Sequence, residues 1–341
     1  MPEKKSPKTD KTNLQVQNRF ISRFKELLPP GHGLAEEIAD VLKVSIDSAY
    51  RRIRCETELT IEEIFKINKK YPISLDEIFS NQSDTVTFSY TKLTDSAVNF
   101  EVYLTRLFMH LQTVNKFENK KLYYVAEEVP MFYSFFSKKL SEFKLFYWQR
   151  SVLNIEAYQK TKFEWGIIPQ KLIDIAYGSY QEYLKIPSVE IWTDETILTV
   201  IKQVSFYFES GIITKVHALE LLTEYRAMVD MLQKNAEIGR KNISDKNETY
   251  FLYDSDVVLG TNCIYAIMGE SKYSYISFNS INSLTTNNHE FCEETEHWMR
   301  NLERKSTLIS NVGEKQRYKF FSQMYKSIDS CIEKISQVLV E

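Results

Sequence analysis

The first 80 residues place apolar side chains at the spacing of α-helices. The pattern predicts five helices, over residues 13–28, 34–42, 46–54, 61–71 and 74–79. Pro29 and Pro72 end two of them, while Ser45 and Thr60 carry hydroxyls suited to capping the helices that follow. We therefore expect a mainly α, five-helix N-terminal domain over residues 13–80.

Two of these helices have apolar stripes that we expect to face the interior. The stripe of the helix over 46–54 consists of Ile46, Ala49, Tyr50 and Ile53. That of the helix over 61–71 consists of Ile61, Ile64, Phe65 and Ile67. Asp47, Ser48, Arg51 and Arg54 would then point away from the core.

Beyond residue 85 the pattern mixes helical and strand periods. It predicts helices over 97–111, 130–148, 171–183, 194–208, 214–233, 290–304 and 314–338. Strands are predicted over 85–90 and 122–126, with three antiparallel strands within 250–279. We expect a helix-dominated α+β domain with a small antiparallel sheet over residues 85–341. The polar segment 80–84 would link the domains, and residues 1–12 would form a flexible basic tail.

Two short helices joined by a tight turn, the second carrying exposed arginines, are typical of a helix-turn-helix. The segments LAEEIADVL, VSIDSAYRRIR, LTIEEIFKI and ISLDEIF carry a family resemblance. Residues 14–80 resemble the lambda-repressor-like, Cro/XRE-type helix-turn-helix, and within it the phage beta-repressor-like proteins. The chain departs from that family at Cys55, where glycine is common after the recognition helix.

The resemblance implies that the helix over 46–54 enters the major groove of double-stranded DNA. We expect Asp47, Ser48 and Arg51 to meet base edges, since arginine pairs well with guanine. Lys43, Arg52 and Arg54 would contact phosphates. Ser45, at the start of this helix, completes the predicted DNA-binding set.

Charge restricts any DNA contact to part of the chain, because the formal net charge of the 341 residues is −3. Residues 1–54 contain eleven lysines and arginines against seven aspartates and glutamates. The excess of positive charge therefore lies at the N-terminal end, where the helix-turn-helix is predicted.

Other candidate chemistry is sparse. His289, Glu293 and His297 share one helix face and could bind a metal, but a solvated face explains them as well. Asp254 and Asp256 suit either acid–base work or a turn. No nucleotide-binding or hydrolase motif occurs, and the four cysteines lack zinc-site spacing. We expect no catalytic residue, metal or cofactor.

Two features of the larger domain leave alternatives open. The aromatic residues between Phe132 and Trp148 form either a ligand pocket or plain core. In the last helix, apolar residues alternate steps of four and three, as in a coiled coil. This spacing fits either a dimer seam or packing within the domain. The residues are Phe321, Tyr325, Ile328, Ile332, Ile335 and Leu339.

Together these patterns predict a cytoplasmic, sequence-specific transcriptional regulator that is not an enzyme. Its larger domain would form a homodimer and sense a small-molecule or protein effector. No apolar run is long enough for a membrane span, and the N-terminus lacks a secretory signal. The alternative function is a protein-interaction or ligand-sensing factor whose helix-turn-helix does not bind DNA.

Overall fold

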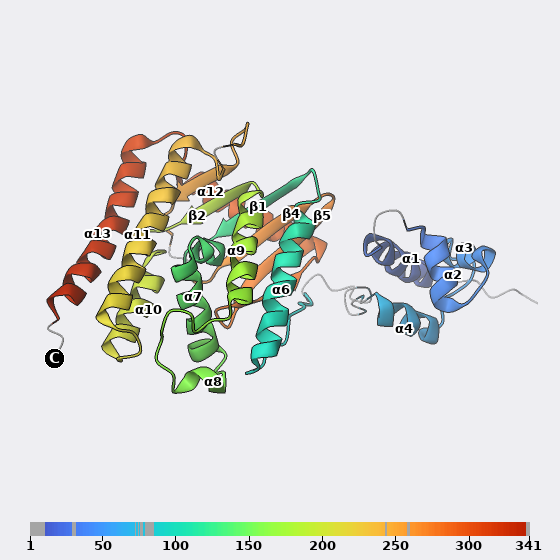
Figure 1. Ribbon diagram of the computed structural model, residues 1–341. Coiled ribbons are helices and arrows are strands. Elements are labelled where there is room, and N and C mark those ends of the chain that lie inside the picture. Colours follow the sequence, from blue (N-terminus) through green and yellow to red (C-terminus); the bar gives the residue numbers. More distant parts are fainter. Residues whose placement is uncertain are drawn as a thin grey trace, which may run out of the picture. The chain divides into compact units, whose positions relative to one another are not determined.

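The chain divides into two compact units, Met1–Thr87 and Phe88–Glu341, which we call the N-terminal and C-terminal units. Figure 1 shows the computed structural model. It describes residues 11–28, 32–71, 73, 75, 78, 85–242, 244–257 and 260–338, and side chains from Val16 onward.

Four helices form the described part of the N-terminal unit. They are α1 (Lys11–Glu26), α2 (Leu34–Leu42), α3 (Ile46–Ile53) and α4 (Ile61–Lys70), each within a few residues of its predicted range. Phe20, Phe24, Ile38, Ala49 and Ile67 are buried at their centre. The predicted fifth helix falls mostly outside the described residues. So does most of the predicted tail, although α1 begins within its last two residues.

Both predicted helix caps are present. Ser45 Oγ accepts a hydrogen bond from the Ser48 N–H at 3.2 Å. Thr60 and Glu63 form a reciprocal capping box, in which each side chain accepts from the other residue's backbone N–H. These bonds satisfy N–H groups that have no partner inside the first helical turn, so they fix where α3 and α4 begin.

The predicted inward stripes of α3 and α4 are too wide. Ile46 and Tyr50 are 51% and 45% exposed, and Ile61 and Phe65 are 83% and 69% exposed. Only Ala49 on α3 and Ile67 on α4 are fully buried. Helical spacing identifies an apolar side of a helix, but it cannot tell how much of that side a neighbour covers.

The C-terminal unit is built on one mixed sheet within the described residues. Its strands are β1 (Lys120–Val125), β2 (Ser188–Trp192), β3 (Tyr250–Asp254), β4 (Cys263–Met268), β5 (Ser271–Phe278), β6 (Asn282–Thr286) and β7 (Thr307–Leu308). The spatial order is β6-β5-β4-β1-β2-β3-β7. β1, β2 and β3 run parallel, and every other neighbouring pair is antiparallel.

Helices cover the two faces of this sheet unequally (Figure 1). One face carries α6 (Ala97–Val114), the 3-10 helix η1 (Met131–Phe135), α7 (Lys138–Tyr147), α9 (Gln170–Leu184), α10 (Leu198–Glu209), α11 (Lys215–Ile238) and α13 (Glu314–Gln337). Between α7 and α9 lie a π-helical turn, η2 (Trp148–Val152), and the short α8 (Glu156–Gln159). The other face carries α12 (His289–Lys305).

Alternation along β1 divides the two cores. Leu122 and Tyr124 pack under the larger helical layer, whereas Tyr123 and Val125 pack with α12. Both parallel connections, β1 to β2 and β2 to β3, step across the sheet in the same direction. Right-handed crossovers therefore put their helices on the same face, as observed.

The predicted small antiparallel sheet is confirmed only in part: β4 and β5 pair antiparallel as predicted, but the sheet is larger than predicted and mixed. β3 belongs beside β2 and β7, not beside β4, and β2, β6 and β7 were not predicted. Residues 85–90 contribute one isolated bridge, between Ser89 and Thr285, and no strand. Strands that are adjacent in sequence were predicted to form hairpins. In the structure, β3 is instead joined to β2 by a long crossover that contains α10 and α11.

A charged pair lies inside the larger core. Lys241 and Glu190 have fully buried side chains, with Nζ 3.5 Å from Oε1. The same carboxylate oxygen accepts hydrogen bonds from the hydroxyls of Tyr133, Tyr183 and Ser188, at 3.0, 2.7 and 2.9 Å. Burial lowers the pKa of Lys241 to about 8, although Glu190 acts in the opposite direction.

Candidate nucleic-acid interface and a polar cleft

Left-handed residues end both helices of the α2–turn–α3 motif. Lys43, after α2, has φ 56°, and Cys55, after α3, has φ 57°. At Cys55 the Glu56 N–H donates to the Arg51 carbonyl at 2.8 Å, and the Cys55 N–H donates to the Arg52 carbonyl at 3.0 Å. This is a Schellman motif, whose left-handed position is usually glycine. Cys55 thus adopts a conformation that glycine adopts most readily.

The exposed side of α3 mixes apolar and charged side chains. Ile46, Asp47, Tyr50, Arg51 and Arg54 are all solvent-exposed. Ile46 and Tyr50 were predicted to face the interior, and that prediction is wrong for both. Helical spacing alone does not separate them from Ala49, which is buried on the same helix.

Arg52 has an internal position instead. Its guanidinium donates to both carboxylate oxygens of Glu63, at 2.7 and 3.2 Å, and to Ser48 Oγ at 2.6 Å. Burial alone would raise the pKa of Glu63, but the Arg52 guanidinium and the Thr60 N–H lower it overall. Arg52 and Ser48, both in the predicted DNA-binding set, are thus engaged within the unit.

Gln17 holds the end of α3 from the side of α1. Its amide Nε2 donates to the carbonyls of Arg52 and Thr57, both at 2.9 Å. Its Oε1 accepts from the Leu59 N–H at 2.9 Å. The loop between α3 and α4 is therefore fixed to α1 by one side chain.

Each exposed cation of the predicted set has an acidic neighbour. Arg51 Nε lies 3.2 Å from Asp47 Oδ2, and Arg54 Nε lies 2.7 Å from Glu56 Oε1. Lys43 Nζ lies 3.0 Å from Asp40 Oδ1, and this contact lowers the pKa of Asp40. The hydrogen bonds that Arg54 donates to the Glu56 carboxylate raise the pKa of Arg54. Such exposed pairs are weak, so the cations remain available to stronger anions.

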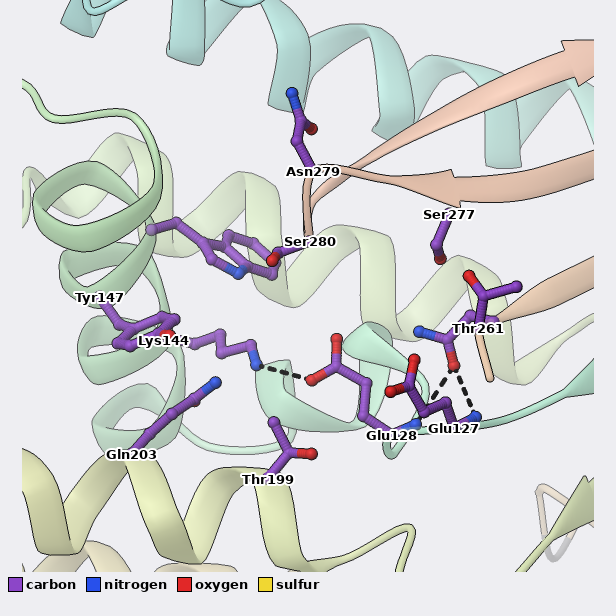
Figure 2. Close-up of a pocket in the computed structure, with 12 residues that line it drawn as sticks. Glu127, Glu128, Lys144, Tyr147, Thr199, Gln203, Thr261, Ser277, Asn279 and Ser280 are labelled. Atoms are coloured by element: carbon purple, nitrogen blue, oxygen red, sulfur yellow. Dashed lines mark hydrogen bonds and ion pairs between the residues drawn. The ribbon is translucent and has the colours of Figure 1, made fainter. Parts of the chain in front are cut away.

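The C-terminal unit has a polar cleft at the carboxyl ends of its parallel strands. Residues that follow β1, precede β4 and follow β5 line it, together with side chains of α7 and α10. Figure 2 shows Lys144 of α7 and Glu128 pointing toward each other across the cleft, with Nζ 3.6 Å from Oε2. Carboxyl ends of parallel strands are the usual ligand sites of α/β sheets.

Asn262 fixes one wall of this cleft. Its Oδ1 accepts from the backbone N–H groups of Glu127 and Glu128, at 2.9 and 3.3 Å. Because both partners are donors, that atom must be the amide oxygen. The Nδ2 amino group therefore has two N–H donors to offer, and no described residue accepts from it. Asn262 is 7% exposed and lines the cleft.

An apolar chamber adjoins the polar cleft, because Glu128, Asn262, Ser277 and Ser280 line both. Side chains from α6, β1, β4 and the segment before β2 form the chamber walls, among them Leu107, Leu111, Val114, Leu122, Ile186 and Ile264. The chamber has a volume of about 130 Å³. It is therefore large enough for a small apolar group.

Acidic side chains gather where β2 and β3 end. Asp194, Glu195, Asp254 and Asp256 line a second polar hollow that shares Glu127 with the cleft. Burial, Asp256 and Asp194 raise the pKa of Asp254. The described residues contain no cluster of three or more histidine, cysteine, aspartate or glutamate side chains arranged to hold a metal.

The remaining sequence candidates lie elsewhere. His289 Nε2 is 3.3 Å from Glu293 Oε1 on the exposed side of α12. The four cysteines are buried and form no disulfide. Within the described part of the chain, no helix has both the length and the apolar character to cross a membrane.

The two open alternatives are resolved in part. Most of the aromatic residues between Phe132 and Trp148 are core, but Tyr147 and Trp148 also line the cleft, and Phe132 lines the chamber. The predicted seam on α13 packs against its own domain: Phe321 and Ile328 are fully buried there. Leu339 lies outside the described residues.

Comparison with known proteins adds no relative. No family model, no curated protein and no solved structure matches the chain.

Proposed function

We propose that the chain is a sequence-specific DNA-binding transcriptional regulator that reads duplex DNA with α3. The observation that carries this proposal is the exposed side of α3, which follows α2 after a tight turn and presents Arg51 and Arg54 beside Ile46 and Tyr50. A helix presented in this way is suited to the major groove. The sequence resemblance to Cro/XRE-type domains supports the same conclusion.

The proposed contacts follow from what is exposed. Arg51 and Asp47 meet base edges, and Arg54 and Lys43 meet phosphates. Ile46 and Tyr50 add apolar surface suited to a thymine methyl group. Ser45 caps the helix that carries them. Arg52 positions this helix through Glu63 and is not proposed as a phosphate contact.

A second function is a candidate because each exposed cation of the set has an acidic neighbour. Arg51, Arg54 and Lys43 each pair with a neighbouring carboxylate. Residues 11–71 contain eleven lysines and arginines and nine aspartates and glutamates, a small excess. A protein-interaction or ligand-sensing factor whose helix-turn-helix does not bind DNA would have such a surface.

A binding experiment with the full chain separates these two functions. Duplexes enriched from a random library would be titrated with protein while fluorescence anisotropy is followed from 50 to 200 mM salt. Lys43 and Arg54 from two protomers give four phosphate contacts, so affinity should fall roughly a hundredfold across this range. If no duplex is enriched, or if affinity does not change with salt concentration, the second function is favoured.

We further propose that the regulator is a cytoplasmic homodimer without enzymatic activity, and that its C-terminal unit responds to an effector. Two recognition helices one DNA turn apart would provide contacts that one small module lacks. The seam on α13 is not proposed again, since that surface is internal.

A further inference from the structure

The polar cleft and the apolar chamber of the C-terminal unit join at Glu128, Asn262, Ser277 and Ser280. A molecule bound across this junction would place an apolar group inside the chamber and a polar head in the cleft. The chamber volume of about 130 Å³ is close to that of apolar cavities that accept benzene, roughly 150 Å³. It therefore suits the side chain of leucine, methionine or phenylalanine.

Two buried donors face the head group. Lys144 has a side chain 5% exposed and makes no hydrogen bond to any described residue; its contact with Glu128 is an ion pair at 3.6 Å. Asn262 offers its amino group, since its oxygen is taken by two backbone N–H groups. Both nitrogens belong to side chains that line the cleft, so an acceptor bound there can reach them.

Carboxylates complete the head-group site. Glu128 lies opposite Lys144 (Figure 2), and the exposed Glu127 also lines the cleft. A purely anionic head would be repelled by these two carboxylates, and a purely cationic head would leave the donors of Lys144 and Asn262 unused. A head group with one negative and one positive charge can pair both with the donors and with the carboxylates.

We infer that this site binds an apolar α-amino acid. Its carboxylate accepts hydrogen bonds from Asn262 Nδ2 and Lys144 Nζ, its ammonium faces Glu127 and Glu128, and its side chain fills the chamber. The amino acid would be the effector of the regulator; that role, but not the binding, rests on the proposed function.

Calorimetric titration of the full chain without DNA tests the binding. Leucine, methionine and phenylalanine should bind, and affinity should rise along the series glycine, alanine, valine, leucine as the chamber fills. Hexanoate lacks the ammonium, and hexylamine lacks the carboxylate, so both should bind at least tenfold more weakly than leucine. Failure of every apolar amino acid to bind at millimolar concentration would overturn the inference, as would equal binding of hexanoate or hexylamine.

The matched variant is Asn262→Asp. It keeps the oxygen that accepts from Glu127 and Glu128 but replaces the amino group by a second oxygen. Leucine affinity should fall roughly 10–100-fold, the loss expected when a charged group loses a hydrogen bond. A folded Asn262→Asp protein that binds leucine as the wild type does would refute the proposed head-group contact. The ligand series needs no variant and decides the matter even if this one fails to fold.

A separate measurement addresses the effector role. Leucine binding that leaves DNA affinity unchanged would remove the role and retain the site. Absence of DNA binding would remove the proposed function and leave the calorimetric result intact.

Discussion

Arg52 and Glu63 join α3 to α4 through two hydrogen bonds between their side chains, Nε to Oε2 and Nη2 to Oε1. Their side chains are only 12% and 15% exposed. The orientation of the proposed recognition helix therefore depends on a charged pair inside the unit.

Arg52→Ala should destabilise the N-terminal unit by about 2–3 kcal/mol, because Glu63 loses its charged partner. Arg51→Ala is the control, since the Arg51–Asp47 pair is exposed and contributes little. Amide hydrogen exchange of α3 and α4 in the full chain measures both. Because the pKa of Glu63 is lowered in the folded state, the deficit of Arg52→Ala should be present near neutral pH and shrink as pH falls through that pKa. Equal protection in the two variants would refute the structural role.

Cys55→Gly should be more stable than Cys55→Ala by about 1 kcal/mol. Both variants lose the thiol and its contact with Asn18, and they differ only in a Cβ at φ 57°. Glycine adopts this left-handed conformation without the steric cost that alanine incurs. The same exchange measurement compares them. A more stable alanine variant would show that burial of the Cβ outweighs backbone strain.

Arg51→Ala should reduce base discrimination and cost roughly 1–3 kcal/mol of specific binding. Arg54→Ala should weaken all duplexes about equally, because it is proposed to meet phosphate. Anisotropy titrations with the enriched duplex and with single-base variants measure both effects. Unchanged discrimination by Arg51→Ala would contradict the proposed groove contact.

The Lys241–Glu190 pair should make stability depend on pH above 8. The folded pKa of Lys241 is about 8 and its ordinary value 10.5, so between these limits the unfolded chain holds more protons. Stability should therefore rise with pH, by roughly 1 kcal/mol per unit, relative to Lys241→Met. Tyr133, Tyr183 and Tyr250 have raised pKa values and act in the opposite sense at higher pH, so the difference between variant and wild type is the quantity to follow. Urea unfolding at pH 7.5, 8.5 and 9.5 provides it, and parallel curves for the two proteins would contradict the prediction.

Light scattering at micromolar protein should give twice the chain mass of 40.2 kDa. The physical reason is the small number of DNA contacts that one module can make. A monomer, with no change when the enriched duplex is added, would refute the homodimer.

The helices were predictable because their signals are local. Ser45 and Thr60 mark helix starts that the structure confirms, and the spacing of Phe20 and Phe24 identified a buried stripe. The sheet was not predictable in this way. β2 has the sequence SVEIW, and all five of its residues are buried. The charged Glu190 interrupts the apolar pattern, so the sequence did not identify a central strand. Its partners Lys241 and Tyr133 lie far away in sequence, and only the tertiary structure brings them together.

The candidate sites show the same difference between local sequence signals and contacts that only the tertiary structure creates. Arg51 and Arg54 are exposed, as their positions on a short helix predict, whereas the internal position of Arg52 depends on Glu63, eleven residues later. Asn262 and Lys144 gave no signal at all. They belong to segments more than a hundred residues apart, and the cleft exists only because β4 returns antiparallel to β1.

Because β1 lies between β4 and β2 in the sheet, the larger unit cannot complete its fold until both of these strands have been synthesised. Its neighbours β2 and β4 leave the ribosome much later, with residues 188–192 and 263–268. Until then β1 has an unpaired edge, and non-local pairing of this kind folds slowly. Nascent chains that stall before β4 would therefore expose an aggregation-prone strand. The described helices α1–α4 pack with the buried side chains of Ile73 and Ile78, so this core draws only on residues that precede β1.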